Sequence, residues 1–156
     1  MEKIKVLMVG AIAALTSFLG VLAIPVYLLV GCNLIDYATG IMASKPRGEK
    51  LSSYKGIKGI QKKVGQWLLV VIGSWVDVLI KYSVENVGVA WKFPFIVSII
   101  VAVWLVVNEM LSILENLNDL GVKMPPFLKP ILNRLKTEVE DVGDQMTEEE
   151  SNADSE

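Results

Sequence analysis

A long apolar run is the feature that most constrains this chain, because no charged residue occurs from position 6 to position 30. A helix needs about 20 predominantly apolar residues to cross a hydrocarbon core of about 30 Å, and this run is longer. Apolar sequence continues past it without a small-residue cleavage site, so we expect the first segment to stay in the protein. The run predicts an all-α integral membrane protein.

Four transmembrane helices fit the pattern of apolar residues, at about residues 6–22, 26–42, 64–80 and 93–107. Pro25 interrupts an apolar run that is too long for one helix and predicts a short helical hairpin. Pro94 suits the first turn of the last helix. A rival topology fuses residues 6–30 into one tilted span. We take residues 1–107 as the transmembrane domain.

Charge in the connecting segments predicts which side of the membrane each one faces. The segment at residues 43–63 has seven basic residues and one acid, whereas the connection between the third and fourth helices is short and nearly balanced. Basic loops remain in the cytoplasm, so with four spans both termini are expected there. The rival topology would place Lys3 and Lys5 outside the cell.

Amphipathic segments follow on the cytoplasmic side. Apolar residues recur every three or four positions through residues 51–64, with lysines between them, which predicts a short basic helix at the membrane surface. We expect Lys55, Lys58, Lys62 and Lys63 to contact anionic lipid headgroups. The last membrane helix should continue to Leu120 and end at Gly121. Residues 108–136 therefore form a cytoplasmic or interfacial helical segment, with a second amphipathic helix from Leu128.

The tail at residues 137–156 is acidic and has few apolar residues to bury. Segments of that composition remain solvated and disordered. We therefore expect no fixed structure there.

Acidic residues inside the apolar stretches are the candidate functional residues. A carboxylate near the bilayer centre costs about 2.5–3.5 kcal/mol on insertion scales, so Asp36 and Asp77 should face a partner, a bundle interior or water. Asp77 lies near the outer end of its helix, where it could also reach the headgroups. The candidate oligomer-interface and pore residues combine polar and small side chains: Asn33, Asp36, Tyr37, Gly40 and Asp77. Candidate subunit contacts at the cytoplasmic face are Asn108, Glu109, Ser112, Glu115 and Asn116.

No enzyme chemistry is indicated. The chain has no histidine and a single cysteine, Cys32, so it lacks imidazole bases and a disulfide framework. Its membrane acids are scattered over different helices, and no nucleophile lies beside a base. We expect a non-enzymatic protein that uses no cofactor, metal or nucleic acid, with Cys32 as a small buried apolar residue.

Three motifs together suggest a family. They are DYATG at residues 36–40, SSYKGIKGIQKK at residues 52–63 and NEMLSILENLNDLGVKMPPFLK at residues 108–129. In this order and spacing they resemble the toxin-secretion and phage-lysis holins of Gram-positive phages and clostridia. The resemblance covers roughly residues 30–135 and leaves the first helix and the acidic tail outside it.

The resemblance implies a small protein of the bacterial cytoplasmic membrane that forms homo-oligomers in an anionic lipid bilayer and opens a lesion. A cytoplasmic murein hydrolase (an endolysin) or a large toxin would leave through that lesion, without necessary direct contact. Two other classes stay open. An ion channel or transporter subunit could use Asp36 and Asp77 as ion sites, although no internal repeat is detected. A membrane scaffold could recruit a partner through its cytoplasmic helices and tail.

Overall fold

The computed structural model describes residues 2–50, 52–88 and 95–153, with side chains described as far as Met146. These residues are helical apart from short connections. In chain order the elements are α1 (Glu2–Leu19), the 3-10 turn η1 (Gly20–Leu22), α2 (Ala23–Ser44), α3 (Ser53–Asn86), α4 (Ile96–Asp119) and α5 (Leu128–Ala153). The prediction of an all-α protein is confirmed for the described part of the chain.

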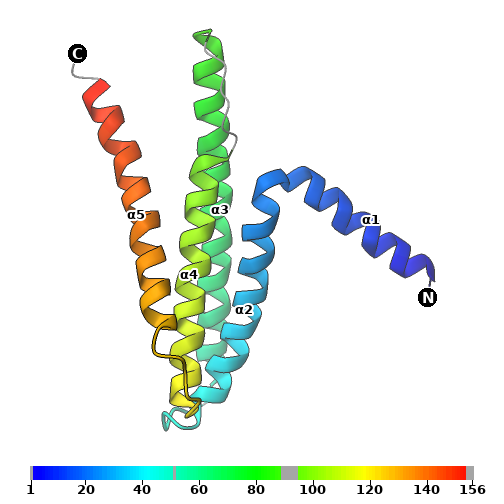
Figure 1. The fold of residues 1–156 in the computed structure, drawn as a ribbon. Coiled ribbons are helices and arrows are strands. Elements are labelled where there is room, and N and C mark those ends of the chain that lie inside the picture. The colour runs from blue at the N-terminus through cyan, green and yellow to red at the C-terminus, as the bar shows by residue number, and fades with distance from the viewer. Residues whose placement is uncertain (1, 51, 89–94, 154–156) are drawn as a thin grey trace.

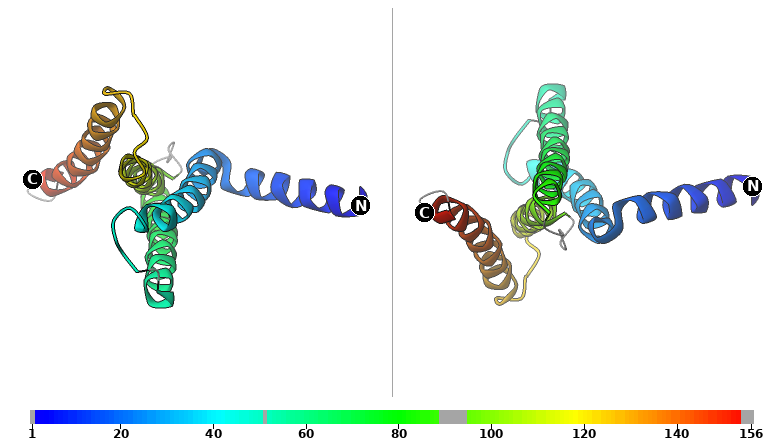
Figure 2. Two further views of the ribbon diagram at one scale, coloured as in Figure 1. Left: turned by 90° about the horizontal axis from the view of Figure 1, so that it is seen from below. Right: turned by 90° about the horizontal axis from the view of Figure 1, so that it is seen from above.

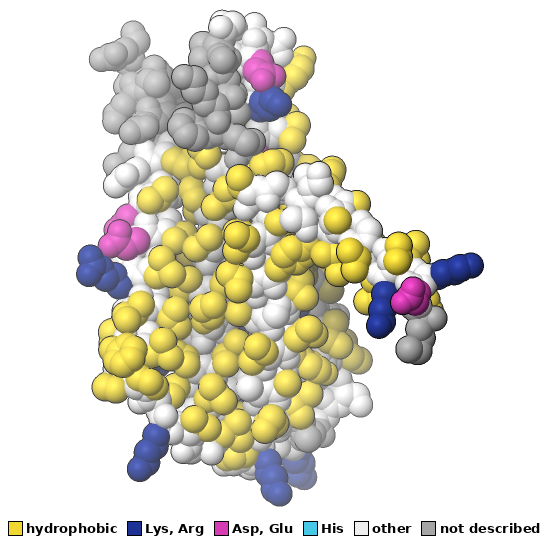
Figure 3. All heavy atoms as spheres, turned by 45° about the vertical axis from the view of Figure 1, so that its right-hand side comes forward, with side chains coloured by type: hydrophobic (Ala, Val, Ile, Leu, Met, Phe, Trp, Pro, Cys, Tyr) yellow, Lys and Arg dark blue, Asp and Glu magenta, His cyan; other side chains and the backbone are white. Residues whose placement is uncertain are grey.

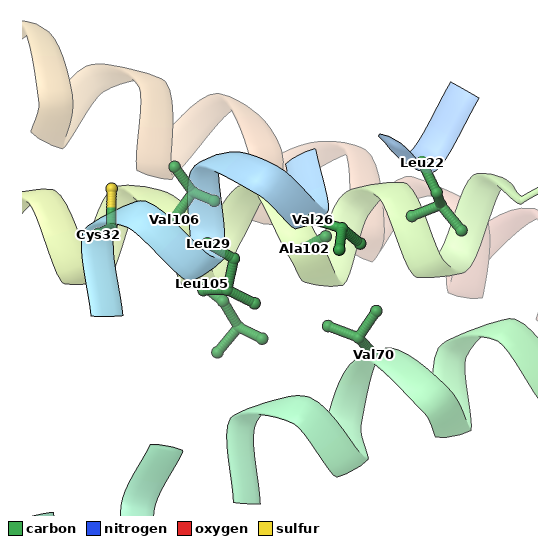
Figure 4. Close-up of a cluster of buried hydrophobic side chains, with 8 residues drawn as sticks. All are labelled: Leu22, Val26, Leu29, Cys32, Val70, Ala102, Leu105 and Val106. Carbon is green, nitrogen blue, oxygen red and sulfur yellow. The ribbon is translucent and has the colours of Figure 1, made fainter. Parts of the chain in front are cut away.

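Helices α2, α3 and α4 form a bundle, with α4 at its centre (Figure 1). Helix α4 packs against α2 and α3 and also against α5, which runs back along it in the opposite direction. The bundle core contains Leu29 of α2, Val70 of α3 and Leu105 of α4 (Figure 4). Cys32 is buried in the same core, as its sequence context predicted. The backbone hydrogen bonds of these segments are made within each helix, as a bilayer requires.

Helix α1 points away from the bundle. The predicted short hairpin, in which α1 and α2 would lie side by side, is therefore wrong. The chain breaks at η1, where Gly20 has a φ of +52°, whereas Pro25 lies in the first turn of α2. Its missing N–H costs nothing at that position, because first-turn amides have no helical partner. The two helices diverge in an open V (Figures 1 and 2). They are linked near the turn by a hydrogen bond of 2.7 Å between the Thr16 and Tyr27 hydroxyls.

Helix α3 is one continuous helix of 34 residues, so the separate basic surface helix predicted at residues 51–64 is wrong. Its first turn is capped by Ser52, whose Oγ accepts from the Lys55 amide at 3.3 Å. Glycines at positions 56 and 59 do not break it, because the Tyr37 ring of α2 packs beside both. Tertiary contact therefore outweighs the weak helix propensity of glycine.

The end of α4 agrees with the sequence prediction, whereas the acidic tail does not. Gly121 follows α4 with a φ of +79°, the left-handed conformation of a helix C-terminus. Pro94, predicted in the first turn, lies outside the described residues. Helix α5 continues to Ala153, so the prediction of disorder from residue 137 is wrong as far as that residue. Ion pairs one turn apart, Arg134–Glu138 and Lys136–Glu140, support the helix despite its polarity.

Three helical segments of the described chain are long and apolar enough to cross a membrane: Glu2–Ser44, Ser53–Asn86 and Ile96–Asp119. The first combines α1, η1 and α2. The face shown in Figure 3 is largely apolar over these helices, and its charged side chains lie at the top, the bottom and the lateral edges. This distribution matches a lipid-exposed surface between two aqueous phases.

Candidate functional site

A polar network joins the three bundle helices at the end where the basic loop lies. Its centre is Lys63 of α3, whose Nζ lies 2.8 Å from Asp36 Oδ2 of α2 and also pairs with the carboxylate of Glu109 from α4. Glu109 is only 1% exposed, although it sits in a helix apolar enough to span a bilayer. One lysine thus bridges two acids from two other helices.

Amides complete the buried side of this network. Gln66, one turn after Lys63, donates from Nε2 to Glu109 Oε1 at 2.5 Å. In the amide orientation that satisfies its neighbours, Asn33 donates to Glu109 Oε2 at 3.1 Å and accepts from the Trp67 indole at 3.2 Å. Glu109 therefore has a cation and two amide donors around it. This matters because a buried charge is tolerated only when it is paired and hydrogen-bonded.

A second half of the network extends to the end of the bundle. Asn116 of α4 donates from Nδ2 to Asp36 Oδ1 and to Thr39 Oγ1, both at 3.1 Å. Its Oδ1 accepts from Arg47 at 2.9 Å, and Arg47 also pairs with Asp119 at 2.5 Å. Together the two halves fix the register of α2, α3 and α4 against one another.

Helical spacing places these side chains on facing surfaces. Asn33, Asp36 and Thr39 are three residues apart on α2, as are Lys63 and Gln66 on α3. Glu109 and Asn116 are two turns apart on α4. Residues three, four or seven apart share one side of a helix, so each helix presents one polar stripe to the others.

Asp77 has a different role at the opposite end of the bundle. It is 4% exposed, and its carboxylate accepts from the amides of Val97 and Ser98 at 2.8 and 2.9 Å and from the Ser98 hydroxyl at 2.6 Å. These amides belong to the first turn of α4, which has no side-chain cap of its own. A carboxylate satisfies such amides and also complements the helix dipole. The expectation that Asp77 could reach the headgroups is therefore wrong.

Gly73 allows this cap to form. It lies one turn before Asp77 on α3, and a Cβ added there would come within 3.0 Å of Ser98 Cα. Nine in ten real Cβ contacts are longer than this. The absence of a side chain therefore lets α3 approach the start of α4 closely enough for the carboxylate to reach its amides.

Comparison with known proteins identifies the family. Residues 13–137 match the bacteriophage holin family. This chain belongs to that family. It is 27% identical to a probable holin of Bacillus phage phi105 over 81% of this chain and 82% of the phage protein. An uncharacterised protein of Halalkalibacterium halodurans is 32% identical over 81% and 90% of the two chains, and an uncharacterised 14.9 kDa protein of Clostridium perfringens is 34% identical over 77% and 83%. No solved structure matches.

Membership in the holin family confirms that this is a multi-pass membrane protein and not an enzyme, because the family consists of non-enzymatic membrane proteins that typically oligomerise. In the described part of the chain, no group of three or more His, Cys, Asp or Glu side chains could hold a metal ion.

The structure separates the predicted site residues of this holin into two groups. Asn33, Asp36, Glu109 and Asn116 come together in the network, and Gly40 faces the Asn116 side chain, which would lie 3.6 Å from an added Cβ. Others lie at the edge or surface. Tyr37 is 37% exposed, Ser112 lines an open pocket beside Asp36, and Glu115 is exposed and pairs with Lys129 at 3.5 Å. Asn108 donates to the Trp104 carbonyl of its own helix.

The predicted lipid-contact lysines also divide. Lys58 and Lys62 are exposed, and Lys55 is exposed but pairs with Glu49 at 3.0 Å. Lys63 contradicts the prediction, because its ammonium group points into the bundle and is held by two carboxylates. The predicted basic surface therefore retains three of its four lysines.

Several features of the network were not predicted from the sequence: Thr39, Arg47, Gln66, Trp67, Asp119 and the role of Lys63. One signal was available. Lys63 and Gln66 share a helix face where the lysine-rich segment enters the apolar run, so Lys63 was placed to meet an acid at the same depth. Its specific partners lie 27 and 46 residues away in sequence, and spacing within one helix cannot identify them.

Proposed function

We propose that this protein oligomerises in the bacterial cytoplasmic membrane and opens lesions through which a cytoplasmic murein hydrolase, or a large toxin, leaves the cell. The observation that carries the proposal is the holin-family match over residues 13–137, which includes α2, α3 and α4 entirely. The broad apolar surface of these helices supports a location in the bilayer.

We also propose four spans with the N-terminus and the end of α4 in the cytoplasm. The predicted cytoplasmic C-terminus is not retained, because α5 runs back along α4 toward the opposite end of the bundle. The helical segment Glu2–Ser44 has 43 residues, which at 1.5 Å per residue is about 65 Å and roughly twice the hydrocarbon core. The turn at Gly20 divides it into two pieces of suitable length. The end of α2, the start of α3 and the end of α4 lie at one end of the bundle together with the basic loop (Figure 1), and basic loops face the cytoplasm.

We propose that subunits assemble through the polar network and through the exposed residues beside it. Asp36, Asn33 and Gly40 hold the three helices together within one chain, whereas Tyr37 and Glu115 remain available to a second copy. Exchange of contacts within the chain for contacts between copies would expose polar groups to water as the lesion opens. Asp36→Ala should therefore delay or abolish lysis, and Glu109→Ala should weaken the cross-linked oligomer. Normal lysis timing of Asp36→Ala would contradict this role.

Exposed lysines at the proposed cytoplasmic face would attract anionic headgroups. Lys50, Lys55 and Lys62 line an open pocket of about 650 Å³ between α2 and the start of α3. Each lysine near an anionic surface contributes about 1 kcal/mol. Loss of two such charges in the double variant Lys58→Gln/Lys62→Gln should weaken association with anionic vesicles more than with neutral ones.

Inducible expression in a bacterium that carries a cytoplasmic murein hydrolase tests the function. Culture turbidity, membrane potential and extracellular hydrolase are followed together. We expect a delay, then abrupt depolarisation with release of the hydrolase. Depolarisation without release would indicate a small ion-conducting pore and would overturn the proposal, as would the absence of both effects, which favours a scaffold.

A further inference from the structure

Helix α5 lies along the part of α4 that is suited to hydrocarbon. Leu132 packs near Val107 and Leu114, the Trp104 indole donates to Glu140 at 2.7 Å, and a Cβ on Gly143 would lie 3.9 Å from Ile100 Cγ2. These contacts occur in reverse order along the two helices, so α5 runs antiparallel to α4 over several turns (Figure 1).

The contacts place the middle of α5 at membrane depth. In α4, residues 96–107 contain no charged or amide side chain, and Asn108 is the first one. Trp104 and Ile100 therefore lie inside the apolar part. Ile100 is eight residues from Asn108, or about 12 Å deeper at 1.5 Å per residue. Glu140 and Gly143 accompany α4 into this region.

The two sides of α5 differ sharply in polarity. A narrow seam of less exposed residues faces α4: Leu128, Leu132, Lys136, Val139, Gly143 and Met146. The face directly opposite is exposed and polar, with Arg134 and Glu138 at 3.4 Å from each other and Asp141 further along. One flank between these two faces is exposed and apolar: Ile131, Leu135 and Val142. Each charge of the polar face in contact with lipid at mid-depth would cost about 2.5–3.5 kcal/mol, so this face cannot be directed toward lipid tails.

We propose that α5 lines the water-filled lumen of the lesion, with its seam on α4 and its charged face toward water. This inference rests on the proposed function, because a lumen exists only in the assembled protein. It adds the charged face of α5 to the wetted surface, beside the polar groups of α2, α3 and α4 that exchange partners on assembly. It also gives the helical acidic segment a place in the assembly.

A reversible cross-link tests whether α5 stays on α4 while the protein works. In a Cys32→Ala background, the pair Ile100→Cys and Gly143→Cys places two thiols at the observed contact, and a copper–phenanthroline oxidant joins them within one chain. Each single variant is the matched control. We expect the disulfide to form in membranes and the cross-linked protein to release hydrolase at the same time as its reduced form.

A fluorophore tests which phase the outer face meets. It is attached through Asp141→Cys in the Cys32→Ala background, or through Val71→Cys on the exposed apolar surface of α3, where the native side chain is 41% exposed. In oligomers assembled in vesicles, we expect iodide to quench the label at position 141 and spin-labelled lipid not to. The label at position 71 should show the reverse.

Three results would overturn the inference: failure of the disulfide to form in membranes, release that stops on oxidation and returns on reduction, or quenching of the position 141 label by lipid. The first two would mean that α5 leaves α4 in the active state. A different failure separates the two proposals. If the Cys32→Ala protein releases no hydrolase although the native chain does, the release assay is repeated with native Cys32 restored. If the native chain itself releases no hydrolase, the proposed function fails, whatever the position of α5.

Discussion

The buried carboxylates at the two ends of the bundle are stabilised in different ways. At the basic end, Asp36 and Glu109 are neutralised by a side-chain cation, Lys63, from a third helix. At the other end, Asp77 pairs with no cation among the described residues and accepts from the amides that begin α4. The first solution depends on a partner of opposite charge, and the second on a helix terminus and its dipole.

This difference separates two kinds of membrane acid. A carboxylate bound to a lysine side chain can exchange that partner for another side chain or for water when subunits assemble. A carboxylate bound to backbone amides cannot move without uncapping α4, because amides of a first turn have no other partner within the helix. We therefore assign assembly to the basic end and fixed architecture to the Asp77 end.

The largest expected effect follows loss of the shared cation. Lys63→Met leaves Asp36 and Glu109 buried without their counter-ion, and breaking a buried pair in this way costs about 3–5 kcal/mol. We expect a loss of that size in the free energy of unfolding, measured by titration with a denaturing detergent. The triple variant Lys63→Met/Asp36→Asn/Glu109→Gln removes all three charges and should recover most of the lost free energy of unfolding.

Lys58→Met is the matched control, because Lys58 lies on the same helix and is exposed. Exposed substitutions usually change stability by about 0.5 kcal/mol or less. Equal stability of the Lys63→Met and Lys58→Met variants would mean that the network does not hold the bundle together.

A smaller loss is expected at the other end. Asp77→Ala removes the acceptor of two amides and one hydroxyl of α4, and a buried donor left without a partner costs about 1–3 kcal/mol. Ser98→Ala removes only the hydroxyl bond and should cost less, about 1 kcal/mol. Hydrogen exchange of the Val97 and Ser98 amides measures the effect directly, since uncapping exposes both.

Glu85→Ala provides the control for this prediction, because Glu85 is an exposed acid near the end of the same helix. Its exchange rates at α4 should match those of the native chain. Unchanged protection in Asp77→Ala would show that another group caps α4.

The sequence made Asp36 and Asp77 look alike, since both are single acids within apolar runs. The helices themselves were predictable from apolar length, and the end of α4 from Gly121. The partners were not, because Lys63, Glu109 and Ser98 come from distant segments that meet only when the helices pack. Polar periodicity identified which faces of α2 and α4 matter, but it could not distinguish a contact inside one chain from a contact between copies.

Local composition also misled at two places. Gly56 and Gly59 have weak helix propensity, yet the Tyr37 side chain packs beside both and α3 continues. The acidic residues after 137 suggested disorder, yet α5 continues as a helix that contacts Trp104 through Glu140. In both cases contact with a neighbouring helix stabilises a segment whose own helix propensity is weak. A prediction from the composition of the segment alone does not include that contact.

Two glycines of α3 separate close packing from helix propensity at the Asp77 end. Gly73→Ala places a Cβ 3.0 Å from Ser98 Cα, so α3 and α4 must move apart and the carboxylate of Asp77 must withdraw from its amides. Overpacking of this kind costs about 1–3 kcal/mol. Gly65→Ala, on the same helix with open space around its Cβ, should instead stabilise by up to about 1 kcal/mol through helix propensity. Opposite signs in the detergent titration would tie the Asp77 cap to helix approach, whereas two stabilising substitutions would show that the helices need not be this close.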